Sequence, residues 1–467
     1  MASPSRPVYL TQDIRRIEKA AGDAPLMERA GAAAADLAVT LLPQNGKDVL
    51  VLAGPGNNGG DARIVARILQ EKFFRVVLAT KAGEIPQNIR WNLVVDGLFG
   101  IGLARPVEGE YASLVEYANR QSCPVLALDI ASGIESDTGR ILGCAVRATH
   151  TLTFIGLKPG LLTLDGPDHC GQVSVADLSL KGSQGESGWV AGRSLFANVL
   201  KARPRNFHKG MAGSVGIIGG FEGMDGAAVL AGRAALKMGA GRVYVGTDKE
   251  GSYFDPQMPE LMFRPAPDVL GLDLDAIVIG PGLGENMGAD ALLGAVLASD
   301  IPCVLDADAL NLIAASADYR PVCAQRTAET IVTPHPAEAG RLLAESTANV
   351  QADRLKAAKI LSENLRANVL LKGNGSVIVA RDGHWFINTS GHPGMASAGM
   401  GDVLSGMLGA LLAQKYSGET SLVLGTHLHG CAADECARNG AGPVGLTASE
   451  LIDPARRIWN RWLDGDD

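Results

Sequence analysis

Short apolar runs rich in β-branched residues recur along this chain, and most end in glycine or a polar residue. In the first part of the chain they are residues 48–53, 75–80, 93–100 and 124–130. Helical spacing of apolar residues marks residues 11–42 and the segment DARIVARILQEK between the first two runs. Strands that alternate with helices in this way are typical of a parallel α/β sheet.

The same alternation restarts further along the chain. New strand candidates occupy residues 214–220, 242–247, 275–282, 302–308, 330–336 and 368–373, and the final third is mainly helical. The stretch KGSQGESG (181–188) is small and polar and has no apolar period, so we expect it to be a linker. For 467 residues we therefore predict two α/β domains, residues 1–185 and the larger 190–467.

Charge and composition exclude several classes of protein. A net charge of -8 argues against nucleic-acid binding, which needs a basic face. The amino terminus has no apolar signal region, and no apolar run is long enough to span a bilayer. Seven cysteines without a CxxC pair favour reduced thiols. We expect a cytoplasmic protein without membrane partners, assembled as a homo-oligomer.

The glycine loop GPGNNGGDA (54–62) follows a strand and opens a helix. It matches GxGxxG and so permits a dinucleotide-binding dehydrogenase, but the next strand ends in Thr80 and Lys81 rather than an acid. A tight turn without a ligand is a second interpretation. Asn57, Asn58 and Asp61 favour a third, because a helix start binds anions and their oxygens suit a hard cation.

Two further acids, Asp96 and Asp129, stand at the ends of later strands. In an open parallel sheet that edge is where ligands bind. Each acid taken alone is equally consistent with a helix cap.

These segments together resemble a known family. LMERAG, GPGNNGGD, VVDGLFGIGLARP, DIASGI and GLKPG are similar to the NAD(P)H-hydrate epimerase domain over roughly residues 8–180. The resemblance implies a Rossmann-like three-layer fold, a potassium ion near Asn58, Asp96 and Ser132, and Asp129 as the acid/base residue with Lys158 nearby. The substrate contacts it implies are Asn57, Asn58, Gly59, Gly60, Asp61, Gly100, Ile101, Gly102, Leu103, Ala104, Arg105, Pro106 and Asp129.

The sequence departs from that family at three places. Ala62 stands where the family usually has glycine, and Ala131 where it has proline. The connection between the strand candidates 75–80 and 93–100, residues 81–92, is short. It has about the dozen residues that a crossover between parallel strands needs. The family normally places a helix and a longer loop there.

In the second domain, loops after strand candidates carry most of the chemistry. GPGLG (280–284) allows close approach to a ligand or forms a simple turn, and Asp306 and Asp308 are expected to cap a helix. His335 lies between two prolines, in an extended loop, as a substrate contact or a residue without a role. Pro336 suits a helix start.

Two other motifs are considered as ligand sites. KGNGS (372–376) predicts a hairpin whose Lys372 and backbone N–H groups are also suited to hold a phosphate. His427 and His429 stand two apart on a predicted helix, so they face different directions and do not form a metal site.

The stretch SAGMGDVLSG (397–406) joins glycines to a helix start. Its first N–H groups suit a negatively charged oxygen, and we expect the helix dipole to lower the pKa of Asp402. A base beside an anion site is what phosphoryl transfer to a hydroxyl requires. A simple helix cap is the alternative.

Residues 195–460 resemble the ADP/ATP-dependent NAD(P)H-hydrate dehydratases of the ribokinase-like superfamily. The resemblance rests on segments that include GAAVLAGRAALKMGAGRVYV, TPHPAE, KGNGS and GMASAGMGDVLSGMLGALL, although His392 stands where that family more often has asparagine. It implies hydrate contacts from Ala227, Gly282, Gly284, His335 and Asp402, with Asp402 as the base. It implies nucleotide contacts from Lys372, Gly373, Asn374, Gly375, Ser376 and Gly401.

An epimerase-like domain fused to a dehydratase-like domain resembles the bifunctional repair enzymes. The resemblance implies an isomerase and lyase that converts R to S hydrates of NADH and NADPH and dehydrates the S form. ADP, or alternatively ATP, with Mg2+ would drive dehydration and release AMP and phosphate. A ribokinase-like kinase of a vitamin alcohol and a nucleotide-sensing protein without activity are the rival hypotheses.

Overall fold

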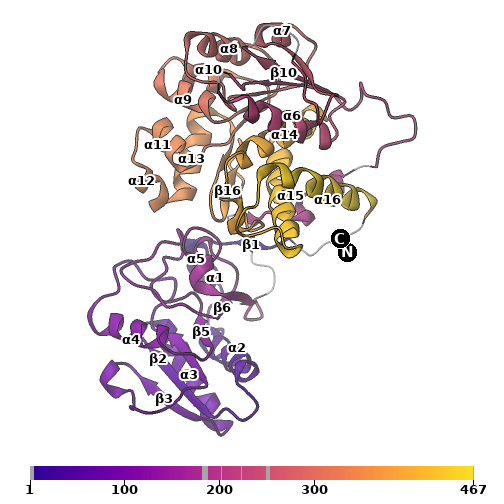
Figure 1. Cartoon of the computed structure of the whole chain (residues 1–467). Coiled ribbons are helices and arrows are strands. Elements are labelled where there is room, and N and C mark those ends of the chain that lie inside the picture. Colours follow the sequence, from indigo (N-terminus) through magenta and orange to yellow (C-terminus); the bar gives the residue numbers. More distant parts are fainter. Residues whose placement is uncertain (1–4, 181–187, 201, 222, 249–252, 466–467) are drawn as a thin grey trace. The chain divides into compact units, whose positions relative to one another are not determined.

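The computed structural model describes residues 5–180, 188–200, 202–221, 223–248 and 253–465, so most of the predicted linker lies outside the described residues. The chain divides into two compact units, Arg6–Trp189 and Val190–Asp467, which we describe separately (Figure 1). Both are α/β units built on largely parallel sheets, as the sequence predicts.

The amino-terminal unit is built on a parallel sheet with the strand order β3-β2-β4-β5-β6-β7. Its elements are β1 (Pro7–Val8), α1 (Thr11–Ala20), α2 (Leu26–Leu41), β2 (Asp48–Ala53), α3 (Asn57–Glu71), β3 (Arg75–Ala79), the 3₁₀ turn η1 (Ala82–Glu84), β4 (Leu93–Gly97), α4 (Gly109–Asn119), β5 (Val125–Leu128), β6 (His150–Phe154), η2 (Pro159–Leu161), α5 (Gly166–Cys170) and β7 (Gln172–Ala176). A short strand β8 (Gly188–Val190) pairs with β1.

Burial on both faces explains the unbroken apolar runs of the central strands. Val49, Leu50, Val51 and Leu52 of β2 are fully buried, as strands covered by helices on both faces require. The alanine-rich helix α2 packs closely on α3 beside this sheet (Figure 1). Small side chains allow the two helices to approach closely.

The order of the strands decides where a ligand can bind. The chain runs from β2 outward to β3 and then returns past β2 to β4, so loops on the carboxyl ends of β2 and β4 diverge. Such a switch point leaves a crevice at that edge of the sheet. Helix α3 begins there at Asn57, four residues earlier than DARIVARILQEK predicts, which places the motif NNGGD in its first turns.

The carboxy-terminal unit has a sheet in the order β17-β16-β15-β14-β13-β12-β9-β10-β11. Its strands and helices are β9 (Ser214–Ile218), α6 (Asp225–Lys237), β10 (Arg242–Thr247), β11 (Met262–Pro265), α7 (Ala266–Leu270), β12 (Ala276–Ile279), α8 (Met287–Ala298), β13 (Cys303–Leu305), α9 (Asp308–Ala315), α10 (Tyr319–Gln325), β14 (Thr330–Val332), α11 (Pro336–Leu343), α12 (Thr347–Ala352), α13 (Arg354–Leu365), β15 (Asn368–Leu371), β16 (Ser376–Val379), β17 (Trp385–Asn388), α14 (Met400–Ala413), α15 (Gly418–Arg438) and α16 (Ile452–Asp464).

This sheet too has a switch point, between β9 and β12. Strands β9 to β15 are parallel, so the loops that follow β9, β12, β13, β14 and β15 meet at one edge. The predicted hairpin at KGNGS is confirmed, because β15 and β16 pair antiparallel with Leu371 opposite Val377. Strand β17 continues the antiparallel part and was not predicted.

Helix α14 is buried over nearly its whole length, and its apolar run is therefore a core helix. No helix in the described part of the chain combines the length and apolar character that crossing a bilayer requires. His427 and His429 both lie on α15, and the seven cysteines are all free.

Close packing in the first glycine loop generates a test of the fold. A Cβ at Gly59 would lie 1.9 Å from the carbonyl oxygen of Gly54, whereas a Cβ at Gly56 would meet nothing within 4 Å. We expect Gly59→Ala to lower the free energy of unfolding of the amino-terminal unit by about 1–3 kcal/mol through overpacking. Gly56→Ala is the matched control and should change it by less than about 0.5 kcal/mol.

Calorimetry of the full-length chain measures both variants. Equal stability of Gly59→Ala and Gly56→Ala would contradict the packing described for this loop.

Candidate active sites

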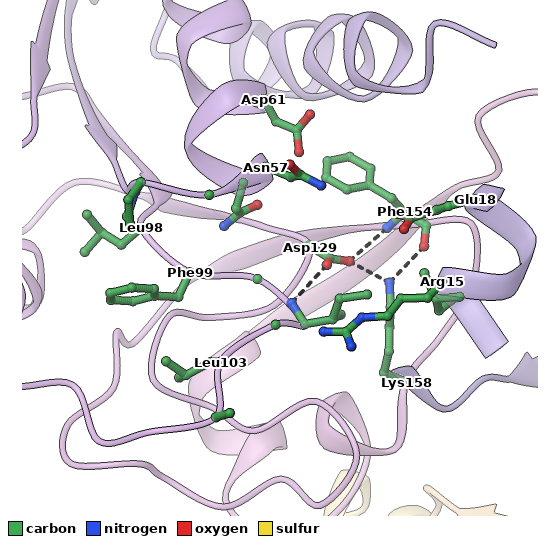
Figure 2. Close-up of a pocket in the computed structure, with 18 of the residues that line it drawn as sticks. Arg15, Glu18, Asn57, Asp61, Leu98, Phe99, Leu103, Asp129, Phe154 and Lys158 are labelled. Atoms are coloured by element: carbon green, nitrogen blue, oxygen red, sulfur yellow. Dashed lines mark hydrogen bonds and ion pairs between the residues drawn. The ribbon is translucent and has the colours of Figure 1, made fainter. Parts of the chain in front are cut away.

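A cavity of about 600 Å³ opens at the switch point of the amino-terminal unit (Figure 2). The segments that line it come from α1, the β2–α3 loop, the first turns of α3, the loop after β4, and the ends of β5 and β6 with the residues that follow them. Its lining residues are Ile14, Arg15, Glu18, Pro55, Gly56, Asn57, Asn58, Asp61, Leu98, Phe99, Gly100, Ile101, Gly102, Leu103, Ala104, Arg105, Asp129, Phe154 and Lys158.

An ion pair forms the chemical centre of this cavity. Lys158 is fully buried, and its Nζ donates to Oδ1 of Asp129 at 2.5 Å and to the carbonyl oxygen of Phe154 at 2.8 Å (Figure 2). The same Nζ donates to Oγ1 of Thr153 at 2.8 Å. Asp129 follows β5 directly and holds a left-handed backbone with φ 67°. This backbone conformation is uncommon for a non-glycine residue, and here it occurs at the strand end where the carboxyl faces the cavity.

Two further carboxyl groups face the same cavity. Burial raises the pKa of Asp61 to about 7, and the charges of Asp129 and Glu18 add to the rise. Burial and the Asp129 charge also raise the pKa of Glu18. Carboxyl groups whose pKa is raised by burial and by neighbouring charges in one cavity are candidates for proton transfer.

Beneath the lining, Asp96 and Ser132 form a buried hydrogen-bonded pair. Ser132 donates to Asp96 through Oγ at 2.6 Å and through its backbone N–H at 2.9 Å. Burial raises the pKa of Asp96 to about 6. The side-chain amide of Asn58 is also buried, and within the described residues neither its nitrogen nor its oxygen has a hydrogen-bond partner.

Most of the predicted contacts of the first domain meet in this cavity. Gly59, Gly60 and Pro106 are not part of its lining. Ala62 and Ala131, which depart from the family pattern, are also absent from the lining. The same holds for the short connection 81–92.

Helix α1 contributes two residues that were not predicted from the sequence. Arg15 and Glu18 lie beside the ion pair in Figure 2. The helical period of residues 11–20 is the sequence signal that could have found them. Ile14 and Ile17 are buried and set the orientation of the helix, which places Arg15 and Glu18, one residue further on in each case, at the cavity.

In the carboxy-terminal unit the predicted residues meet at the carboxyl edge of the parallel strands. A Cβ at Gly282 would lie 3.2 Å from Cβ of Ala227, and a Cβ at Gly401 would lie 3.4 Å from Nζ of Lys372. Gly399 is the left-handed N-cap of α14, with φ 87°. Asp402 therefore lies in the first turn of α14 and is not its N-cap. The alternative prediction, that Asp402 is a simple helix cap, is wrong.

The expected direction of the Asp402 pKa is wrong. Burial raises this pKa to about 6, and the charge of Asp306 adds to the rise, while Lys372 acts against it. Desolvation outweighs the helix dipole because the carboxyl is largely shielded from water. A carboxylate with a pKa near 6 is mostly ionised at neutral pH and is a stronger base than an ordinary aspartate.

The half-buried Lys372 and the buried Asp306 form a second ion pair. Nζ of Lys372 lies 2.8 Å from Oδ1 of Asp306, and Oγ of Ser405 donates to Oδ2 of Asp306 at 2.6 Å. Burial would raise the pKa of Asp306, but Lys372 and these hydrogen bonds outweigh it and hold the pKa below the usual range. Glu338 lies 3.8 Å from the same ammonium.

The expectation that Asp306 and Asp308 cap a helix is also wrong. Helix α9 begins at Asp308 and has no side-chain cap. Asp308 instead accepts a hydrogen bond at 2.8 Å from the backbone N–H of Gly284. This hydrogen bond orders the glycine loop after β12.

His335 is the residue that caps a helix. Its Nδ1 accepts from the N–H of Ala337 at 3.1 Å and from that of Glu338 at 3.4 Å, and Pro336 begins α11 as predicted. Its Nε2 lies 3.2 Å from Oε1 of Glu338, and the side chain is 46% exposed, so one face of the ring is open to a ligand. Burial, Lys372 and Arg341 lower its pKa, which favours the neutral ring at neutral pH.

Comparisons with known proteins agree with this geometry. Residues 215–457 match the family model of NAD(P)H-hydrate dehydratases. Residues 23–92 and 80–160 match the family model of YjeF-related protein N-termini. The two matched parts overlap at the short connection.

Relatives match almost the whole chain. The bifunctional NAD(P)H-hydrate repair enzyme of Coxiella burnetii is 37% identical over 97% of this chain and 99% of its own. That of Escherichia coli strain K12 is also 37% identical, over 97% of this chain and 94% of its own.

Solved structures match the second unit. The ADP/ATP-dependent NAD(P)H-hydrate dehydratase of Bacillus subtilis, crystallised with ATP and Mg2+, is 29% identical with a TM-score of 0.50, over 56% of this chain and 94% of its own. A ribokinase-like superfamily protein of Enterococcus faecalis is 26% identical with a TM-score of 0.51, over 58% of this chain and 94% of its own.

Fold and site thus define a two-unit α/β enzyme whose second unit is ribokinase-like. The chain belongs to the family of bifunctional NAD(P)H-hydrate repair enzymes.

The buried Lys158–Asp129 pair generates a prediction about stability. Lys158→Met leaves the buried Asp129 charge uncompensated, so we expect the free energy of unfolding of the amino-terminal unit to fall by about 3–5 kcal/mol. Adding Asp129→Asn removes that charge and should restore part of the loss. Calorimetry of both variants measures the effect, and a double variant no more stable than Lys158→Met would contradict it.

Proposed function

We propose that this enzyme repairs hydrated NADH and NADPH in two steps, one at each site. The amino-terminal unit interconverts the R and S epimers of the hydrate, and the carboxy-terminal unit dehydrates the S epimer at the expense of ADP. The observation that carries the proposal is the carboxylate of Asp402 in the first turn of α14, beside the Lys372 ammonium near Gly401. A base next to a positively charged helix start suits phosphoryl transfer to a hydroxyl.

The hydrate carries a hydroxyl on the ring carbon next to nitrogen, and hydroxide is a poor leaving group. Asp402 removes the proton of this hydroxyl, whose oxygen attacks the terminal phosphorus of ADP while AMP leaves. Lys372 and the N–H groups near Gly401 stabilise the charge on the transferring group. The nitrogen lone pair then expels phosphate, and loss of a proton from the adjacent carbon restores the reduced ring.

Nucleotide and hydrate occupy opposite sides of Asp402 in this proposal. Lys372, Gly373, Asn374, Gly375, Ser376 and Gly401 hold ADP, which enters as its Mg2+ complex and thus as a substrate. Ala227, Gly282, Gly284 and His335 hold the hydrate. ADP is the proposed phosphoryl donor, as the resemblance to the bifunctional repair enzymes implies, and ATP is the alternative, since the similar Bacillus subtilis enzyme is named ADP/ATP-dependent.

In the amino-terminal cavity, Asp129 transfers the proton at the epimerising carbon, and Lys158 fixes the position and charge of Asp129. Asn57, Asn58, Asp61 and residues 100–105 line the cavity and hold the substrate, whereas Gly59, Gly60 and Pro106 support the loops around it from outside the lining. Because the short connection 81–92 contributes nothing to the lining, it gives no reason to expect a loss of epimerase activity. We also propose that the enzyme forms a homo-oligomer.

The residues beneath this cavity fit a potassium ion. Asn58 offers a buried carbonyl oxygen without a partner in the described structure, and Asp96 offers a fully buried carboxylate whose charge a cation would offset. Oxygen ligands of this kind suit a hard cation. Asn58, Asp96 and Ser132 would hold the ion, which would order the loops around Asp129.

The role of Asp402 gives a prediction about rate and pH. Asp402→Asn should lower kcat of ADP-dependent dehydration by about 10²–10⁴-fold, because the base is lost. In the wild-type enzyme kcat should fall as pH drops through about 6, because a protonated Asp402 accepts no proton.

Assays of NADH recovery and of AMP and phosphate release measure both effects. One AMP and one phosphate per NADH are expected. A stable phosphorylated product would support the rival kinase hypothesis, and a rate independent of pH from about 5 to about 8 would contradict Asp402 as the base.

Potassium binding gives a prediction that does not depend on activity. Exchange of K+ for tetramethylammonium should lower the melting temperature of the amino-terminal unit, because a bound ion stabilises only the folded state. Asn58→Leu should abolish this difference between the two salts. An undiminished difference in Asn58→Leu would contradict the assignment.

A further inference from the structure

Arg354 is an arginine in an unusual position. It is the first residue of α13, only 2% of its surface is exposed, and it is among the largest fully buried side chains in the described structure. Arginine is almost never fully buried unless it is paired. Burial lowers its pKa to about 10, so the guanidinium remains charged at neutral pH.

The guanidinium bridges both sides of the nucleotide loop, residues 372–376. Its Nη1 donates to the carbonyl oxygen of Asn374 at 2.5 Å, and its Nη2 donates to that of Leu371 at 3.2 Å. Leu371 ends β15 and Asn374 lies in the turn, so one planar group holds two carbonyls that flank Lys372 and Gly373. A guanidinium fork suits this task because its donors have fixed directions.

Gly373 shows how closely the loop lies on this group. Its φ is 147°, and a Cβ there would lie 2.6 Å from Nη2 and 3.0 Å from Cζ of Arg354. A side chain at position 373 would thus displace either the loop or the guanidinium. Glycine at position 373 therefore allows the loop to lie directly against Arg354.

The same loop supplies the ammonium of the site. Nζ of Lys372 pairs with Asp306 and lies beside Gly401, at the start of α14. Carbonyl oxygens directed at a phosphate would repel it. When Arg354 binds two of them, it removes two negative dipole ends from the loop and places a positive charge behind it.

We propose that Arg354 is a positioning residue for the diphosphate of the nucleotide, acting through the 372–376 loop. This inference rests on the proposed function, and it adds a residue outside the segment KGNGS to the determinants of nucleotide affinity. Arg354 contacts neither the hydrate nor Asp402 in this account. Its loss therefore weakens ADP binding and leaves the chemical step intact.

Steady-state kinetics of three full-length variants test the proposal. Arg354→Met should raise KM for ADP by about tenfold or more, because two hydrogen bonds from a charged donor are lost. Arg354→Lys should recover only part of this, since an ammonium lacks the fork that spans both carbonyls. In both, kcat at saturating ADP and KM for the hydrate should stay within about twofold of wild type.

The matched control is Lys356→Met, which removes an exposed positive charge from the same helix, two residues away. Its KM for ADP should equal that of the wild type. A rise similar to that of Arg354→Met would overturn the proposal in favour of a general charge effect. An unchanged KM for ADP in Arg354→Met, or an equal rise in KM for the hydrate, would also overturn it.

Calorimetric titration with ADP alone separates this proposal from the proposed function. If the wild type binds ADP but does not restore NADH, the proposed function fails while the affinity of Arg354→Lys still tests the loop. If Arg354→Met does not fold, Arg354→Lys and Gly373→Ala provide the test, and wild-type affinity in both would overturn the proposal.

Discussion

The ion pair between the half-buried Lys372 and the buried Asp306 is the interaction on which the second site depends. It joins the ends of β15 and β13, and Ser405 ties it to α14, so three elements distant in sequence are fixed together. Two charges taken out of water are costly unless hydrogen bonds satisfy them, as here. The pair places a cation beside Gly401, and the Asp306 charge helps to raise the pKa of Asp402. One interaction thereby prepares both the phosphate site and the base.

The first site follows the same physical logic with different residues. Lys158 and Asp129 form a buried pair at the carboxyl edge of a parallel sheet, again next to the switch point. Because strand ends and glycine loops leave a crevice there, each unit places its charged groups where a ligand can reach them. The dehydratase site accepts one epimer in the proposed reaction, so an epimerase on the same chain allows the whole pool of hydrate to be repaired.

Sequence patterns predicted the α/β fold, most strands, the KGNGS hairpin and the strand ends on which both sites lie. They did not predict the pairing of Lys372 with Asp306, because residues so far apart have no local signal that brings them together. The pKa of Asp402 was expected to fall, since helix position is visible in sequence and desolvation is not. The cavity residues Arg15 and Glu18 were missed because α1 reads as an ordinary amphipathic helix.

The central claim is that the two sites act in succession on one substrate. Its most direct test is the recovery of NADH absorbance from a mixture of both hydrate epimers with ADP and Mg2+. We expect complete recovery, at a rate above that of spontaneous epimerisation. Recovery that stops when one epimer is consumed would contradict an active first site, and no recovery at all would contradict the repair function itself.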